Sequence, residues 1–266
     1  MKEADLVSII TPSCNTARFI AETIESVMAQ TYTNWEMIIV DDCSTDNTDE
    51  VVAAYVAKDS RIHYLKNEEN SGAALTRNRA LREARGRWIA FLDSDDLWHP
   101  EKLERQIRFM EKNRYAFSYT CYSEIDSEGY ETGIQVSGPT KITMRRMFAF
   151  CWPGCLTVMY DANVVGLVQI KDIKKNNDYA MWLKVCRKAD CHLLPLFLGK
   201  YRRGRIGSIS THGYATLIKW QYKLWHEAEK MSLVSSIVMT GLNLIFGGYK
   251  KLKYIDKRLY DSEMNT

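Results

Sequence analysis

The sequence lacks a continuous apolar run long enough to cross a bilayer. Its longest hydrophobic stretch lies at 233–246 and is interrupted by small or polar residues: Ser235, Ser236, Thr240, Gly241 and Asn243. A spanning helix needs roughly 20 consecutive apolar residues, so we expect no transmembrane helix. The first five residues carry no apolar core of the kind found in secretory signals, and we expect no signal peptide.

Two glycine-rich phosphate-binding motifs are absent as well. Neither G-x-x-x-x-G-K-S/T nor G-x-G-x-x-G occurs in the 266 residues, which argues against P-loop nucleotide hydrolases and dinucleotide-dependent dehydrogenases. The formal net charge is only +3, and the basic residues do not alternate with aromatic residues as they do in nucleic-acid-binding surfaces. We therefore expect no nucleic-acid partner.

An even set of paired cysteines is missing, because the chain has seven. Without a secretory segment, this number predicts reduced thiols and a cytoplasmic setting. A structural zinc site is the alternative, since Cys151 and Cys155 are closely spaced and Cys186 precedes Cys191 and His192. Such a site needs two close pairs of ligands, whereas Cys155 opens a predicted strand and Cys186 lies on an apolar helix face. We therefore disfavour zinc.

The chain does contain a regular alternation of short β-rich runs and helical patterns from Leu6 to Leu92. This alternation is typical of successive βαβ units and a mainly parallel sheet. Strands are predicted at 6–11, 35–40, 62–65 and up to 93, and helices near 20–28, 48–58 and 73–84. The expected fold class is α/β, with a Rossmann-like central sheet flanked by helices.

The alternation loosens beyond Tyr115. Strands are predicted at 116–122 and 156–160, a turn at 126–129, and a helix at 178–186. We interpret this half as completing the same sheet and covering its active edge. After residue 213 we expect two further helices, the second near 233–246, as a C-terminal helical appendage.

Carboxylates gather where two of the predicted strands end. Segment 93–96 holds three aspartates after one apolar strand, and Asp41-Asp42 follow another. An open α/β sheet binds its ligand at this edge, and crowded carboxylates commonly share a hard divalent cation. Two alternatives stay open: the first group is a solvated turn, and the second is an acidic cluster at a helix start with Ser44 and Thr45 as caps.

Three motifs carry a resemblance to a known family. The segments Val7–Asn15, Ile39–Asp46 and Phe91–Asp96 occur in this order, and together they resemble the inverting family 2 glycosyltransferases of the glycosyltransferase-A fold. Asn70-Ser71-Gly72 followed by Thr76-Arg77-Asn78 is similar to the family's N-x-G and A-R-N segment. Any one of these motifs alone is weak, and their specificity is high as a set.

Two later motifs extend the match to roughly residues 5–211. Asn177–Leu183 resembles the family's acidic helix start that leads to a W-L pair, and Tyr201–Arg203 with Ser208–Ser210 resembles its Y-R and S-x-S close. The resemblance makes Arg202, Arg203 and His212 candidates for contact with a diphosphate or an acceptor.

The resemblance implies a nucleotide-sugar donor that is read at the first two strands. The backbone near Thr11 and Pro12 and the carboxylate of Asp42 would hold a uracil, with the carboxylate accepting the proton on N3. That arrangement favours a UDP-sugar.

The resemblance also implies a divalent metal. Asp93 and Asp95 match the family's D-x-D pair, with Asp95 as the direct metal ligand and Asp93 nearer the ribose or the donor sugar. Mn²⁺ or Mg²⁺ would neutralise the diphosphate and make UDP a better leaving group. Arg77 would add a fixed positive charge to the same phosphates.

Asp178 matches the position of the family's general base, at a helix start across the cleft from the donor. It would take the proton of an acceptor hydroxyl as that oxygen attacks the anomeric carbon from the face opposite UDP, which inverts the configuration. Asn177 stands where the family commonly has a first acidic residue, so one carboxylate remains. The alternative is that Asp178 only caps its own helix.

These roles imply a catalytic domain at 1–212, with a nucleotide-sugar-binding half at 1–98 and an acceptor-binding half at 99–212. The predicted enzyme moves a hexose or N-acetylhexosamine from a UDP-sugar to a polyprenyl-diphosphate-linked saccharide in surface polysaccharide biosynthesis. The alternative is a nucleotide-sugar-binding subunit that has lost catalysis, which the intact set Asp93, Asp95 and Asp178 disfavours.

The segment 213–266 combines aromatic and basic side chains around a predicted amphipathic helix. They are Trp220, Tyr222, Trp225, Tyr249, Tyr254, Lys219, Lys223, Lys250, Lys251, Lys253, Lys257 and Arg258. This composition favours docking at an anionic membrane surface, on the inner face of the cell membrane. The alternative is a helical appendage that packs on the catalytic domain or on a dimer partner.

Overall fold

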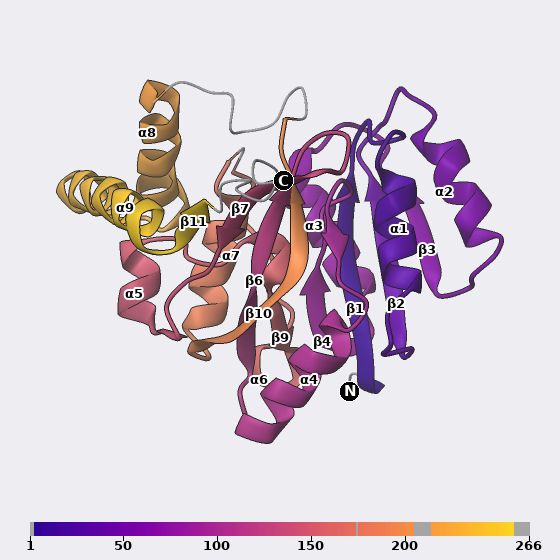
Figure 1. The fold of residues 1–266 in the computed structure, drawn as a ribbon. Coiled ribbons are helices and arrows are strands. Elements are labelled where there is room, and N and C mark those ends of the chain that lie inside the picture. Colours follow the sequence, from indigo (N-terminus) through magenta and orange to yellow (C-terminus); the bar gives the residue numbers. More distant parts are fainter. Residues whose placement is uncertain (1–2, 174, 205–213, 258–266) are drawn as a thin grey trace, which may run out of the picture.

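A twisted sheet runs through the molecule, and its N-terminal half is parallel (Figure 1). The computed structural model describes residues 3–173, 175–204 and 214–257. Four parallel strands lie side by side in this order: β3 (Ile62–Lys66), β2 (Trp35–Asp41), β1 (Glu3–Ser13) and β4 (Gly86–Phe91). Every residue of β2 is buried, as expected for a parallel strand that is covered on both faces. The predicted α/β class is confirmed.

Helices cover both faces of the parallel half of the sheet. Successive residues of a strand point to opposite faces, so each strand packs against helices on both sides. On one face Ile9 and Ile39 pack against α1 (Ile20–Met28) and α4 (Lys102–Asn113). On the other face Ile10 and Ile38 pack against α3 (Gly72–Glu83). The third crossover helix is α2 (Thr48–Val56), beside β3.

The second half of the sheet is mixed, so the predicted parallel arrangement holds only for the first half. β9 (Met159–Asp161) is antiparallel to both β4 and β6 (Phe117–Ile125). β6 is also antiparallel to β7 (Glu131–Val136) and parallel to β10 (Cys191–Arg202). Two short strands, β5 (Leu97–Trp98) and β8 (Lys141–Ile142), pair antiparallel with β10.

The predicted strand at 156–160 begins later than expected. Its first residues form a 3-10 turn, η1 (Cys155–Thr157), because the Gly154 carbonyl accepts hydrogen bonds from both the amide and the hydroxyl of Thr157. The predicted strand at 116–122 continues to Ile125 as β6. The predicted turn at 126–129 is confirmed by a hydrogen bond from the Gly129 amide to the Asp126 carbonyl.

The remaining helices lie on the side of the sheet that is covered by α3. They are α5 (Met144–Ala149), α6 (Ala162–Val165), α7 (Asn177–Cys186), α8 (Tyr214–Lys223), the π-helical turn η3 (Leu224–Ala228) and α9 (Leu233–Lys253). After α9 the chain adds β11 (Ile255–Lys257), antiparallel to β7. The C-terminal segment thus joins the central sheet. None of the described helices is long and apolar enough to span a bilayer.

Candidate active site

The carboxyl ends of β1, β2 and β4 lie at one edge of the sheet, since Ser13 is in register with Asp41, and Ile10 with Phe91. Asp42 follows β2 directly and is buried. Its Oδ1 accepts hydrogen bonds from the Asn67 side chain and the Ser71 amide, and its Oδ2 from the Gly72 amide, each at 2.8 Å. The carboxylate therefore binds the N-terminus of α3, where helix amides favour an anion.

The alternative in which Ser44 and Thr45 cap a helix start is wrong. Helix α2 begins at Thr48, whose amide donates to Asp46 Oδ1 at 3.1 Å. The Ser44 amide instead donates to Asp41 Oδ1 at 2.7 Å. These contacts fix the loop after β2.

Thr11 and Pro12 lie near the carboxyl end of β1, in register with Ile39 and Val40 of β2. The Thr11 hydroxyl is buried and has no hydrogen-bond partner among the described residues. Pro12 is partly exposed. Both therefore lie at the same sheet edge as Asp42, as the sequence predicts.

Arg77 joins the two halves of the predicted site. Its Nη2 donates to Asp93 Oδ1 and its Nη1 to Asn177 Oδ1, each at 2.5 Å. The guanidinium is only 6% exposed, and burial alone would lower its pKa. The negative charge of Asp93, with that of Asp178, reverses this effect and raises the pKa of Arg77. Arg77 thus holds the loop after β4 against the start of α7.

Asp178 lies in the first turn of α7, and its Oδ1 accepts a hydrogen bond from the Tyr179 amide at 2.8 Å. Loss of hydration raises the pKa of this carboxyl, while the Arg77 charge and the Tyr179 amide oppose the rise and the Asp93 charge adds to it. A carboxylate whose pKa is raised holds a proton more strongly, which is the property of a general base.

The loop that carries Asp95 is fixed by Arg202 from β10. Arg202 Nε donates to the Asp95 carbonyl at 2.9 Å, and Arg202 Nη2 donates to Glu22 of α1 at 2.7 Å. The amide of Arg202 also donates to Asp96 Oδ1 at 2.9 Å. Burial, together with the charges of Asp95 and Asp93, raises the pKa of Asp96 well above its ordinary value. Asp96 is therefore more readily protonated than an exposed aspartate.

No three His, Cys, Asp or Glu side chains in the described part of the chain are grouped closely enough to hold a metal ion. The donor chemistry at 93–96 nevertheless fits a hard cation, because it consists of carboxylate oxygens. Mg²⁺-type ions are commonly held by one or two carboxylates together with substrate phosphates.

Comparison with known proteins identifies the family. The model of "Glycosyl transferase family 2" matches residues 8–157, which is more than half of the chain. The chain belongs to glycosyl transferase family 2. This glycosyltransferase is 41% identical over 214 residues to WfgD of Escherichia coli, covering 80% of this chain and 82% of WfgD. The full name of WfgD is UDP-Glc:alpha-D-GlcNAc-diphosphoundecaprenol beta-1,3-glucosyltransferase.

A second relative is TuaG of Bacillus subtilis (strain 168), which its name assigns to teichuronic acid biosynthesis. The glycosyltransferase is 45% identical to TuaG over 183 residues, covering 69% of this chain and 73% of TuaG. Among solved structures, TarS of S. aureus (residues 1–349) in complex with UDP-GlcNAc is similar, with a TM-score of 0.70 at 19% identity. That match covers 95% of this chain and 74% of TarS, and it confirms the glycosyltransferase-A fold.

The structure brings Arg77 and Asp93 together beside Asp178, and places Asp42 at the N-terminus of α3, the helix that carries Arg77. Sequence reasoning missed the roles of Asn177 and of the clamp made by Arg202 and Glu22. The A-R-N and Y-R motifs indicated the two arginines but not their partners, because those partners are distant in the sequence. Ser208–Ser210, His212 and Arg258 lie outside the described residues.

Proposed function

We propose that this glycosyltransferase moves a hexose or an N-acetylhexosamine from a UDP-sugar to a lipid-linked saccharide in surface polysaccharide biosynthesis. The observation that carries the proposal is the bridge from Asp93 through Arg77 to Asn177. It brings the acidic loop after β4 and the carboxylate of Asp178 to one place. The UDP and UDP-GlcNAc complexes of TarS support a uridine donor, and the diphosphoundecaprenol in the name of WfgD supports a lipid-linked acceptor.

The proposed base reader is Asp42 with the backbone near Thr11 and Pro12. Asp42 Oδ1 accepts two hydrogen bonds, but Oδ2 accepts only the Gly72 amide among the described donors. Each carboxylate oxygen offers about two acceptor positions, so Oδ2 retains capacity for the N3 proton of a uracil. A carboxylate at this point selects uracil over cytosine, whose N3 carries no proton.

Asp95 and Asp93 are the proposed metal ligands, and Mn²⁺ or Mg²⁺ the proposed metal. When bound, the ion would neutralise the diphosphate leaving group. A structural neighbour, the mannosyltransferase PcManGT of Pyrobaculum calidifontis, was solved with GDP-Man and Mn²⁺. It has a TM-score of 0.60 at 15% identity, covering 91% of this chain and 75% of PcManGT.

Asp178 is the proposed general base. The acceptor oxygen would form a bond to the anomeric carbon while the bond from that carbon to the UDP oxygen breaks, and the acceptor proton would pass to the Asp178 carboxylate. Attack from the face opposite UDP inverts the anomeric configuration. Arg77 holds Asn177 and Asp93, and therefore fixes the distance between the base and the donor loop.

Calorimetric titration tests the donor site. We expect UDP to bind in the presence of Mn²⁺, with weaker binding in EDTA. We expect CMP and NAD to bind at least about tenfold more weakly because cytosine and adenine have no ring N–H to donate to Asp42, and GDP to bind more weakly because its larger purine places its N1 proton differently from the N3 proton of uracil. Absence of binding by all four nucleotides would contradict the proposal at its base. Equal binding of UDP with Mn²⁺ and with EDTA would contradict only the proposed metal site.

The variant Asp178→Asn tests the base. An amide cannot take the acceptor proton, so we expect transfer to fall by about 100-fold or more, while UDP binding stays within about twofold of wild type. Transfer is measured as UDP release in the presence of a diphosphoundecaprenol-linked N-acetylglucosamine. A variant that transfers at the wild-type rate would show that the base is elsewhere.

We also propose that the enzyme acts at the cytoplasmic leaflet of the cell membrane, because its proposed acceptor, a diphosphoundecaprenol-linked saccharide, stays in the bilayer. Membrane contact by the C-terminal segment is part of the same proposal. The sequence suggested Trp225 as one of the aromatic residues that contact the membrane. In the structure Trp225 is fully buried and packs against Tyr179 and Phe148. Trp225 is therefore not available to a membrane.

A further inference from the structure

Helix α9 reverses the usual polarity of a surface helix. Its buried residues are Ser236, Thr240 and Asn243. Its exposed residues include Val234, Ile245 and Leu252, whose exposed fractions are 69%, 68% and 89%. A surface helix normally turns its apolar stripe toward the core. In contrast, the fully buried residues of α9 are polar, Met239 and Phe246 are only partly buried against the core, and most of its other apolar residues face outward.

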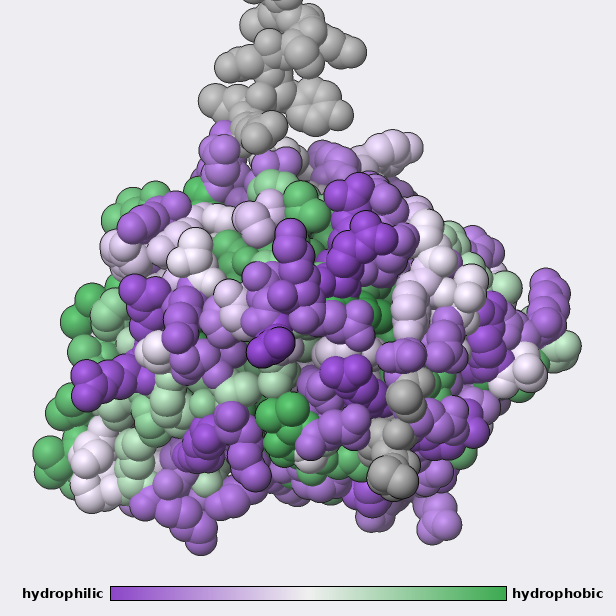
Figure 2. Space-filling view, turned by 90° about the horizontal axis from the view of Figure 1, so that it is seen from below, coloured by the Kyte–Doolittle hydropathy of each residue, from purple (hydrophilic) through white to green (hydrophobic). Residues whose placement is uncertain are grey.

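The apolar residues share one side of the helix, at 3.6 residues per turn. We define the outer face of α9 by its exposed apolar residues: Val234, Ile237, Val238, Ile245, Tyr249 and Leu252. The helix has 21 residues, so the outer face extends over about 30 Å. Figure 2 shows hydrophobic surface gathered at the left margin of the molecule, the side on which α8 and α9 lie in Figure 1.

The inner side of α9 is fixed by directed hydrogen bonds. Asn243 Nδ2 donates to the carbonyls of Phe148 and Ala149, at 3.2 and 2.5 Å. One turn from the end, Lys250 Nζ donates to the Trp152 carbonyl at 2.8 Å. Rotating the helix to hide its apolar side would break these bonds and leave polar groups unpaired, which is costly. The outer face is therefore held in its exposed orientation.

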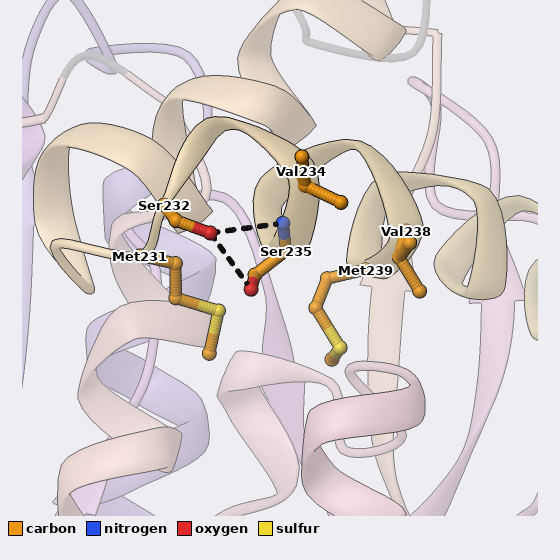
Figure 3. A pocket seen from close by; sticks show the side chains of 6 residues that line it. All are labelled: Met231, Ser232, Val234, Ser235, Val238 and Met239. Carbon is orange, nitrogen blue, oxygen red and sulfur yellow. Dashed lines mark hydrogen bonds between the residues drawn. The ribbon is translucent and has the colours of Figure 1, made fainter.

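A hollow of about 480 Å³ opens beside the first turns of α9 (Figure 3). It is lined by Met231, Ser232, Val234, Ser235, Val238 and Met239. The Ser235 hydroxyl accepts a hydrogen bond from the hydroxyl of Ser232, and the Ser235 amide donates to the same Ser232 oxygen. The two serines thus satisfy each other at the helix cap, and the side chains left to meet a ligand are apolar.

We propose that the outer face of α9 docks on an anionic lipid surface. The charges around it favour this partner, because α9 contains no acidic residue and its last turn carries the exposed Lys251 and Lys253. A second copy of this chain would bring the same lysines close to one another, whereas the headgroups of anionic lipids would complement their positive charge. An apolar face with lysines at its margin and a tyrosine at its end is the pattern of an interfacial helix.

Docking through the outer face would also orient the proposed active site relative to the membrane. Lys250 lies on the inner side of α9, where burial lowers its pKa against the attraction of Cys151 and Asp178. The helix that meets the lipid is thus within electrostatic reach of the proposed base. This inference deepens the proposed function, and rests on it for the acceptor: a lipid-linked saccharide would reach Asp178 from the membrane side.

Co-sedimentation of the full chain with vesicles tests the proposal, using phosphatidylcholine with and without phosphatidylglycerol. We expect wild type to bind the anionic vesicles and the double variant Val238→Asp/Ile245→Asp to bind at least about tenfold less, since it loses apolar contact and adds repulsion. The matched control is Val164→Asp on α6, because Val164 and Val238 are both 55% exposed. We expect Val164→Asp to bind as wild type does.

Two results would overturn the proposal. One is failure of wild type to sediment with anionic vesicles, and the other is an equal loss in the Val164→Asp control. A lipid-free dimer in sedimentation velocity that Val238→Asp/Ile245→Asp dissociates would assign the outer face to a second copy instead. UDP titration of the same samples separates this test from the proposed function: UDP binding without vesicle binding overturns only the docking, and vesicle binding without UDP binding overturns only the donor site.

Discussion

At the scale of single residues, Arg77 shows what the sequence could predict and what it could not. The A-R-N motif indicated an arginine for the diphosphate. In the structure its two terminal nitrogens already bond Asp93 and Asn177, and its buried Nε has no partner among the described residues. A phosphate would therefore have to bind Nε or share a terminal nitrogen with one of these partners. Asn177 is 100 positions away, so local sequence carries no signal of the contact.

The raised pKa of Asp178 gives a prediction for the pH dependence of transfer. Arg77 and Asp93 face this carboxyl, and Cys151 and Lys250 are within electrostatic reach. Because burial favours the protonated form, the base becomes unavailable as pH falls through a pKa above the ordinary value of about 3.9. We expect the acid limb of kcat to lie above that value. The limb is measured with a lipid-linked acceptor across the acidic range.

The raised pKa of Asp178 also predicts how the stability of the fold depends on pH. The folded chain binds this proton more tightly than the unfolded chain, so the Asp178 carboxyl costs the most stability above its folded pKa. The cost falls as pH drops through that pKa and is gone below the unfolded pKa of about 3.9. Asp178→Asn should therefore raise the melting temperature at neutral pH, with little difference from wild type in acid. An acid limb at the ordinary aspartate value, or a variant that is less stable at neutral pH, would show that Asp178 is not the shifted group.

At the scale of elements, the helices were predictable and the direction in which α9 faces was not. Periodicity located a helix near 233–246, and the structure extends it to Lys253. An apolar stripe normally predicts the buried side. Here Asn243 occupies that side and bonds to the last two residues of α5, whereas the sequence left both membrane docking and packing on the domain open. Only the partner carbonyls, about 95 positions away, decide the orientation.

Asn243 offers a test at this scale. The substitution Asn243→Leu leaves the Phe148 and Ala149 carbonyls without their donor, and we expect unfolding to cost about 1–3 kcal/mol less than in wild type. Urea titration followed by tryptophan fluorescence measures the difference. The matched control is Asn113→Leu, because the Asn113 amide bonds the Phe109 carbonyl at an exposed site. Equal losses in both variants would contradict a bracing role for Asn243.

At the scale of the whole molecule, the parallel half of the sheet followed from the sequence, but the mixed half did not. The βαβ units of 6–92 join successive strands through helices, so periodicity is enough to predict that these strands are parallel, although it does not predict that β4 pairs with β1 rather than with β3. In contrast, β9 inserts between β4 and β6, and β11 returns to β7 from the far end of the chain. Such insertions depend on packing between distant segments, which no local pattern encodes.

The clamp made by Arg202 has a consequence for synthesis of the chain on the ribosome. Glu22 and Arg202 are 180 positions apart, yet together with the Asp95 carbonyl they hold the acidic loop. A nascent chain can form its early parallel strands while Arg202 is still unmade, because contacts near in sequence close first. The donor loop is completed only after β10 has been made. We expect the emerging polypeptide to form the parallel half of its sheet well before it has its catalytic competence.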